Sequence, residues 1–129
     1  MRSEKDVEAY LLRLRGTYKT VEGSPGTFLV KSEGDMPPVA IRVDPPLVVV
    51  RVNVGDATDD NVPLLRKLLE LNAKSLVHSS YGLEDGHIVL SSALELENLD
   101  FNELEATLDE IDMALSQQIP VLAGLSKKN

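Results

Sequence analysis

His78 and His87 are the only histidines of the chain, and two acids, Glu84 and Asp85, lie between them. Strand-forming residues flank Glu84, Asp85 and Gly86, so this region predicts a hairpin that brings the histidines toward each other. Two imidazoles and a carboxylate are a ligand set suited to a divalent metal ion. Because the spacing matches no metal-binding motif, no metal ligand is assigned. A small-ligand-sensing or metal-sensing role for this hairpin is the alternative hypothesis for the function.

Serines and carboxylates elsewhere do not form a catalytic arrangement. The serines near the same hairpin lie in predicted strands, without the glycine-flanked turn that exposes a nucleophile: Ser79, Ser80, Ser91 and Ser92. Glu105 and Asp109 stand one turn apart on a predicted helix, where an open helical face leaves both carboxylates solvated. The sequence therefore predicts no catalytic residue, no cofactor and no enzymatic activity.

Length and composition are those of one globular domain. The chain has 129 residues, 43% hydrophobic and 26% charged, so we expect residues 1–129 to form a single domain. It contains no cysteine, which suits a reducing compartment and favours the cytoplasm. The longest apolar run, Leu47 to Val50, is too short to cross a membrane. A net charge of −8 argues against a nucleic-acid partner, because phosphates are bound by clustered cations.

The acidic residues are unevenly distributed. No lysine or arginine occurs from Ser75 to Ser126, whereas ten carboxylates lie between Glu84 and Asp112. These carboxylates either form a solvated, solubilising face or steer a basic partner segment toward the protein.

The N-terminal half predicts one helix and four strands. Ser3 and Asp6 have the spacing of a capping box and begin a helix over residues 4–15, which Gly16 ends. Four segments rich in strand-forming residues follow: 17–22, 27–32, 39–43 and 47–54. Residues 23–26 have the composition of a turn, so the first two strands form a hairpin.

Residues 47–54 are predicted to form the central strand. One face of this strand carries only valines: Val48, Val50, Val52 and Val54. The other face is half apolar: Leu47, Val49, Arg51 and Asn53. This second face is either partly covered by another element or left as a contact surface.

The C-terminal half predicts two further helices around a second hairpin. A helix begins near Pro63 and has so broad a stripe of leucines that we expect it to be largely buried as the spine of the core. The strands of the hairpin lie near residues 77–83 and 88–96. Asp100 and Glu103 repeat the capping box and begin a third helix.

The third helix is predicted to be amphipathic and to end or kink at Pro120. Its polar face is expected to be solvated: Glu103, Glu105, Asp109, Glu110 and Asp112. Residues 119–129 are then an apolar C-terminal tail that docks on the domain. The complete prediction is an α+β fold in which an antiparallel sheet of five to six strands carries three helices, in the order α-β-β-β(β)-α-β-β-α.

Three segments suggest a family. Residues 63–72 (PLLRKLLELN), 81–83 (YGL) and 86–90 (GHIVL), followed by an acidic, leucine-rich last helix, resemble the YbjN-like branch of the class I type III secretion chaperone superfamily. The resemblance extends over roughly residues 4–118. It implies a type III secretion chaperone-like antiparallel sheet carrying helices, a homodimer, and binding of an extended or partly unfolded protein segment without nucleotide.

A set of apolar residues is least easily assigned to one internal core: Leu47, Val49, Val121, Leu122 and Leu125. We predict that these residues bind a partner polypeptide, in a chaperone-like or adaptor-like role. The alternative is that they are ordinary core residues and that the tail docks within its own chain.

Overall fold

The computed structural model describes residues 2–31 and 36–126. Helices and strands follow one another in this order: α1 (Glu4–Arg15), β1 (Lys19–Thr20), β2 (Thr27–Val30), β3 (Val39–Asp44), β4 (Leu47–Asp56), α2 (Val62–Lys74), β5 (Ser80–Glu84), β6 (His87–Glu95) and α3 (Phe101–Ser126). The order confirms the predicted α+β succession of elements, with the optional additional strand present.

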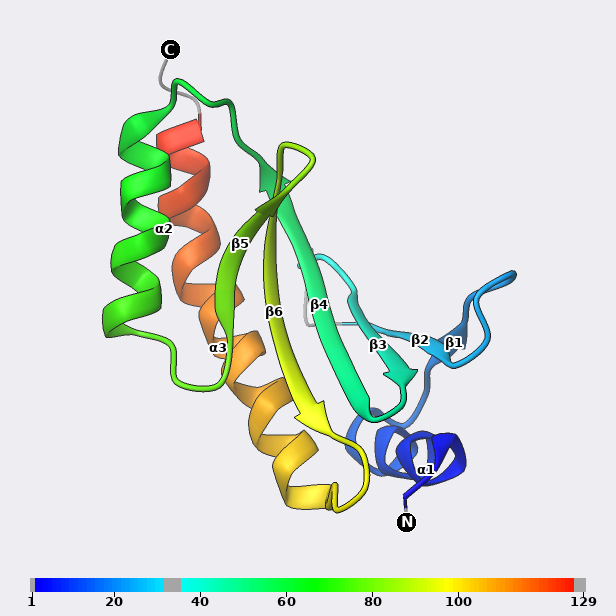
Figure 1. Ribbon diagram of the computed structural model, residues 1–129. Coiled ribbons are helices and arrows are strands. Elements are labelled where there is room, and N and C mark those ends of the chain that lie inside the picture. Colours follow the sequence, from blue (N-terminus) through cyan, green and yellow to red (C-terminus); the bar gives the residue numbers. More distant parts are fainter. Residues whose placement is uncertain (1, 32–35, 127–129) are drawn as a thin grey trace.

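The six strands form one antiparallel sheet in the order β1-β2-β3-β4-β6-β5 (Figure 1). β4, the longest strand, lies between β3 and β6, as predicted for a central strand. The turn at Pro45 and Pro46 joins β3 to β4, and the hairpin turn at 23–26 joins β1 to β2. All neighbouring strands are antiparallel. The chain makes a crossover through α2, because β6 lies between β4 and β5 in the sheet.

Burial follows the two-residue period of the strands. On β4, Val48, Val50 and Val52 are buried, whereas Leu47 and Asn53 are exposed. The pairing continues the buried face across the sheet, because Val50 lies opposite Ile41 on one side and Ser92 on the other. Apart from Val89, the buried strand residues all belong to this face.

The three helices all pack on that same face. Buried side chains of α1, α2 and α3 join the strand valines in one apolar cluster, to which α1 contributes Val7 and α2 contributes Leu64. α3 supplies the largest share, including Leu104, Leu108 and Ile111. Figure 1 shows α2 and α3 side by side along the sheet, with α1 near the turn between β3 and β4. The domain therefore has two layers, and the second face of its sheet carries no helix from the described residues.

Both predicted capping boxes are present. The backbone N–H of Ser3 donates to Asp6 Oδ2 at 2.8 Å, and the N–H of Glu103 donates to Asp100 Oδ1 at 2.8 Å. These side chains satisfy N–H groups that have no partner within the first turn of a helix. Gly16 ends α1 with a φ of 76°, a conformation that favours glycine.

α2 is less buried than predicted. Leu64, Leu68 and Leu71 face the core, but Leu69 is 70% exposed and Val62 is 61% exposed. The broad apolar stripe of this helix thus has an inner half that packs on the sheet and an outer half that meets solvent. The prediction of α2 as the spine of the core is wrong, because α3 occupies that position.

The last helix was predicted to end or kink at Pro120, and the structure contradicts the first of these outcomes. α3 continues through Pro120 to Ser126, so residues 119–126 are helical and only 127–129 of the predicted tail lie outside the described residues. A proline inside a helix costs about 3 kcal/mol, because its backbone nitrogen has no hydrogen to donate. Burial of Leu122 and the hydrogen bond from Asn61 Nδ2 to the carbonyl of Leu125, at 3.2 Å, offset that cost.

Two carboxylates of α3 have structural partners instead of the predicted solvated positions. Glu110 accepts hydrogen bonds from the backbone N–H groups of Val77, His78 and Ser79, at 3.1–3.2 Å, and from the Ser79 hydroxyl at 2.8 Å. Asp112 accepts from Arg15 of α1 at 2.6 Å. These two residues tie the start of β5 and the end of α1 to the last helix.

We expect Glu110→Gln to lower the free energy of unfolding by about 1–2 kcal/mol near neutral pH, because a neutral amide binds the three N–H groups more weakly than a carboxylate. Asp109→Asn, at the neighbouring exposed position, is the matched control and should change the free energy by less than about 0.5 kcal/mol. Urea unfolding followed by circular dichroism measures both changes.

The same variant has a defined pH dependence. Burial raises the pKa of Glu110, but the hydrogen bonds from Ser79, His78 and Val77 outweigh burial, so the pKa lies below its ordinary value of 4.5. A carboxyl whose pKa is lowered by folding stabilises the fold above its unfolded pKa, and this stabilisation is lost as pH falls through the folded pKa. The stability difference between wild type and Glu110→Gln should therefore shrink below a pH of about 4.5. A difference that stays constant down to a pH of about 3 would contradict this assignment.

Candidate protein-binding surface

The sheet face turned away from the helices carries partly exposed apolar side chains. Leu47 is 39% exposed, and Val49, Leu29 and Ala40 are half-buried. The strand register brings them together, because Leu29 lies opposite Ala40, and Val49 is two residues from Leu47 on the same strand. We call the surface formed by six residues the open sheet face: Leu29, Ala40, Arg42, Leu47, Val49 and Arg51.

Leu47 and Val49 occupy the positions predicted from the sequence. Neither belongs to the apolar cluster beneath the helices. A cluster of this kind on an uncovered surface is typical of an interaction site, whereas single exposed apolar residues are common on any protein. Leu47 and Val49 lie on a face that no helix of the described segments covers, which favours a contact surface over a second internal core.

A shallow hollow of about 310 Å³ lies on the open sheet face. Ala40 and Val49 form its apolar part, and Arg42 and Arg51 stand beside them. Each arginine has an acidic partner within its own chain: Arg42 contacts Asp44 at 2.8 Å, and Arg51 contacts Glu84 at 3.0 Å.

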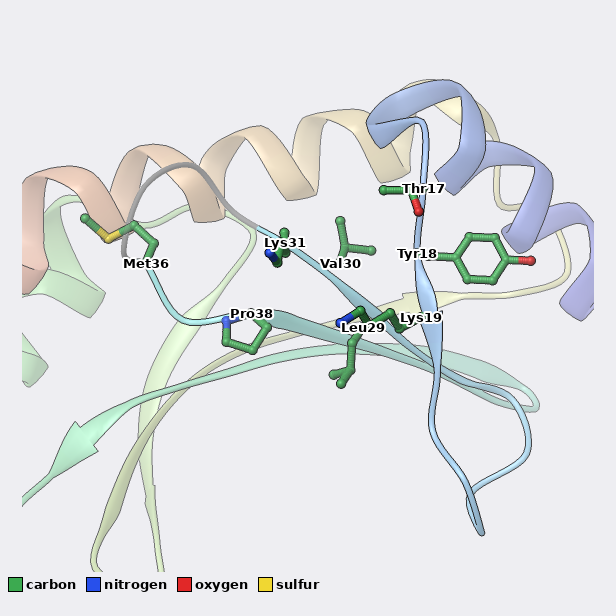
Figure 2. Close-up of a pocket in the computed structure, with 8 residues that line it drawn as sticks. All are labelled: Thr17, Tyr18, Lys19, Leu29, Val30, Lys31, Met36 and Pro38. Atoms are coloured by element: carbon green, nitrogen blue, oxygen red, sulfur yellow. The ribbon is translucent and has the colours of Figure 1, made fainter.

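A second hollow, of about 320 Å³, lies at the β1–β2 edge of the sheet (Figure 2). Thr17, Tyr18 and Lys19 line one part of it, and Leu29 and Val30 of β2 with Lys31 line another. Met36 and Pro38 complete the lining. β1 pairs only with Phe28 and Leu29 of β2, so β2 and Lys31 extend past the short edge strand. Among the described residues, no strand pairs with β2 beyond β1 on this side, and an unpaired strand edge is the requirement for adding an extended segment.

The opposite edge is closed by side chains. Asn72 of α2 binds the backbone of Tyr81 on β5 in both directions: the Tyr81 N–H donates to its Oδ1 at 2.6 Å, and its Nδ2 donates to the Tyr81 carbonyl at 3.0 Å. Glu110 binds the N–H of Ser79 just before the same strand. An amide side chain that occupies edge groups prevents strand pairing there. Of the two sheet edges, the β5 edge is thus the one whose backbone groups are bound by side chains of α2 and α3.

The remaining predicted contact residues lie in the helical layer. Val121 is 46% exposed, but it lies on α3 and not on the open sheet face. Leu122 is 4% exposed and belongs to the core, so it is not available to a partner in this fold. Leu125 is partly buried against the same core. The tail residues therefore do not form one surface with Leu47 and Val49.

The predicted meeting of the histidines is wrong. His87 lies opposite Glu84, at one end of the β5–β6 pair, whereas His78 precedes Ser80 at the other end. The strand between them spans on the order of 13 Å. His87 instead contacts Asp56, with 2.6 Å between Nδ1 and Oδ1. Within residues 2–31 and 36–126, no three histidine or acidic side chains are grouped to hold a metal ion.

Tyr81, on strand β5 of this hairpin, is part of the core. Its hydroxyl donates to Gln118 Oε1 of α3 at 2.6 Å, and the ring is 6% exposed. Burial raises the pKa of Tyr81 to about 12, so the phenol stays neutral at physiological pH. The second hairpin therefore presents no convergent polar site, and the small-ligand or metal-sensing alternative is not supported.

Comparisons with known proteins confirm the fold and the resemblance. The family model CesT_Tir_1 matches residues 1–128. A comparison with curated protein sequences gives no match. None of the helices in the described part of the chain has the length and apolarity needed to cross a membrane.

Solved structures with the same fold include proteins of type III secretion systems. A chain of the heterodimeric ExoU–SpcU complex of Pseudomonas aeruginosa superposes with a TM-score of 0.72 at 17% identity, over 94% of this chain and 98% of that one. YbjN of E. coli, described as a putative transcription regulator, gives 0.66 at 13% identity, over 88% of both chains. The Yersinia pestis type III secretion chaperone SycH, solved with a fragment of YscM2, gives 0.60 at 20% identity, over 87% of this chain and 98% of that one.

The two faces of β4 provide a matched pair of substitutions. Val48→Ala should lower the free energy of unfolding by about 2 kcal/mol, because it removes buried methyl groups and leaves a cavity. Val49→Ala, one residue further on the open sheet face, should cost less than about 0.7 kcal/mol. Urea unfolding of the two variants compares them directly. Equal losses would show that both faces of the sheet are covered in solution.

Proposed function

Because the chain belongs to the CesT_Tir_1 family, we propose that it is a non-catalytic chaperone or adaptor that holds a partner polypeptide on the open sheet face. The observation that carries this proposal is the group of apolar side chains, led by Leu47 and Val49, on a face that carries no helix from the described residues. The similar ExoU–SpcU and SycH structures are both complexes with another protein, which supports a protein as the partner.

The open sheet face alone supports weak binding. Complete burial of an aliphatic side chain contributes about 1.5–3 kcal/mol, and Leu29, Leu47 and Val49 are already partly buried. The three together contribute on the order of 3–5 kcal/mol, before the cost of association. A segment that also pairs with the β1–β2 edge adds backbone hydrogen bonds, and the combination reaches the affinity needed to hold a partner and release it.

The outer half of the α2 stripe supports a homodimer. Val62, Leu65 and Leu69 recur along one side of α2, and Leu83 of β5 is 52% exposed. A helix with so much exposed apolar surface is stabilised when a second subunit covers it. We therefore include a dimer that pairs α2 stripes in the proposal, together with the cytoplasmic location that the cysteine-free composition favours.

The partner site is tested by a double substitution, Leu47→Asp with Val49→Asp. Two charges on the open sheet face should abolish recovery of the partner from the native cell, while circular dichroism shows a folded domain. Leu12→Asp places a charge on an exposed leucine of α1 and serves as the control that retains the partner. Recovery of the same partner by all three proteins would refute the site.

The dimer is tested by Leu69→Asp, because a carboxylate in an apolar interface is costly to bury. Size-exclusion chromatography with light scattering should give twice the chain mass of 14.1 kDa for wild type and a single chain mass for the variant. Leu12→Asp should remain dimeric. A wild-type protein that elutes as a monomer at all concentrations would end the dimer proposal.

A further inference from the structure

The two arginines of the open sheet face occupy a diagonal across β3 and β4. Arg42 lies opposite Val49, and Arg51 lies opposite Ala40. In this group of four residues, the two arginines are diagonal neighbours, and so are the two apolar residues. All four line the same hollow of about 310 Å³. Diagonal neighbours on adjacent strands are about 7–8 Å apart at their α-carbons. Ser24, Thr27 and Asp44 line the rest of the hollow. The hollow thus presents two guanidinium groups beside Ala40 and Val49, and one of them, that of Arg42, is paired with the Asp44 carboxylate.

Neither arginine is committed to a strong internal contact. The side chains in the Arg42–Asp44 pair are 59% and 55% exposed, and those in the Arg51–Glu84 pair are 40% and 61% exposed. Ion pairs this exposed contribute about 0–1 kcal/mol, so a carboxylate from a partner replaces or joins the internal acid at little cost. Arg15 is different, because its pair with Asp112 is only 20% and 28% exposed and links α1 to α3.

Charge on this face of the sheet is arranged from the middle outward. By register, Lys19 stands in the same row as Leu29, Ala40 and Arg51. The acids of the face lie at the strand ends: Asp44, Asp56, Glu84 and Glu95. A molecule with a net charge of −8 therefore places Arg42 and Arg51 on the central strands of the surface where we propose that the partner lies, and Lys19 in the same row at the β1 edge.

We propose that the partner segment is acidic: it is extended, and carboxylates at alternate positions bind Arg42 and Arg51 while neighbouring aliphatic side chains pack on Val49 and Leu47. This inference rests on the proposed function and specifies the chemistry of the partner. Alternate residues of an extended chain are about 6.8 Å apart, close to the spacing of the arginine diagonal. Charged hydrogen bonds to arginine then select the segment, and apolar contact holds it.

Three synthetic peptides of equal length test the chemistry. In each peptide, every second residue is threonine, and the residues between the threonines face the protein. These are leucines and one pair of test residues, which is two glutamates, two glutamines or two lysines. Fluorescence anisotropy should show that the glutamate peptide binds at least about tenfold more tightly than the glutamine peptide, and less tightly as salt is raised. Because the whole chain is acidic, non-specific attraction would favour the lysine peptide instead.

Matched variants locate the binding. Arg42→Gln and Arg51→Gln should each weaken the glutamate peptide about tenfold and leave the glutamine peptide unchanged. Arg66→Gln, at an exposed position of α2 in the helical layer, should leave both affinities unchanged. Val49→Asp should abolish binding of the glutamate peptide.

The peptide and variant experiments separate failure of this inference from failure of the proposed function. Equal or tighter binding of the glutamine or lysine peptide, or no binding of the glutamate peptide, overturns the acidic-segment inference. So does glutamate-peptide binding that persists in Val49→Asp, because the site then lies elsewhere. If the native partner is lost in the Leu47→Asp and Val49→Asp double variant but retained in Arg42→Gln with Arg51→Gln, the proposed function stands and only this inference fails.

Discussion

The packing of three helices against one face of the sheet, through Val48, Val50 and Val52 of β4, is the interaction on which the rest of the structure depends. β4 is central, so its buried valines contact neighbours on both sides and the helices above. Because successive side chains of a strand point to opposite faces, fixing these valines inward also fixes Leu47, Val49 and Arg51 outward. The alternation of side chains along β4 thus determines both the buried core and the open sheet face.

The helical layer also determines which sheet edge is accessible. Asn72 binds both backbone groups of Tyr81, and Glu110 binds the backbone before β5, so this edge is occupied from within. At the other edge, the strand β1 has just two residues in the part of the chain that the structure describes. Exposed edges promote aggregation, and most proteins protect them. The β5 edge is thus protected, whereas the β1 edge strand is short. This difference fits the proposal that a segment of another chain is added at the β1–β2 edge.

Much of the fold follows from local sequence patterns. The alternation of valines from Val48 to Val52 and the two capping boxes predict elements that the structure contains, because their causes lie within a few neighbouring residues. The positions of Leu47 and Val49 on the opposite face of β4 follow from the same alternation. The family segments at 63–72 and 81–90 correctly indicated the fold.

Features that depend on contacts between distant segments could not be predicted in this way. Helix α3 continues past Pro120 because Leu122 is buried and Asn61 binds the carbonyl of Leu125. The residues around Pro120 in the sequence do not predict either contact. Glu110 belonged to an acidic run that favoured a solvated face, yet its partners lie more than thirty residues earlier. The sequence shows the broad leucine stripe of α2. The sequence of one chain does not tell whether the outer half of this stripe is buried within the same subunit or against another.

The proposed function requires that the open sheet face, and not the helical layer, contacts the partner. Replacing one residue at a time by the photo-crosslinking amino acid benzoylphenylalanine in the native cell tests it most directly, at Val49 on the sheet and at Val121 on α3. The account predicts a stoichiometric protein crosslink from position 49 and none to that protein from position 121. A partner crosslinked from position 121 and not from position 49 would contradict it.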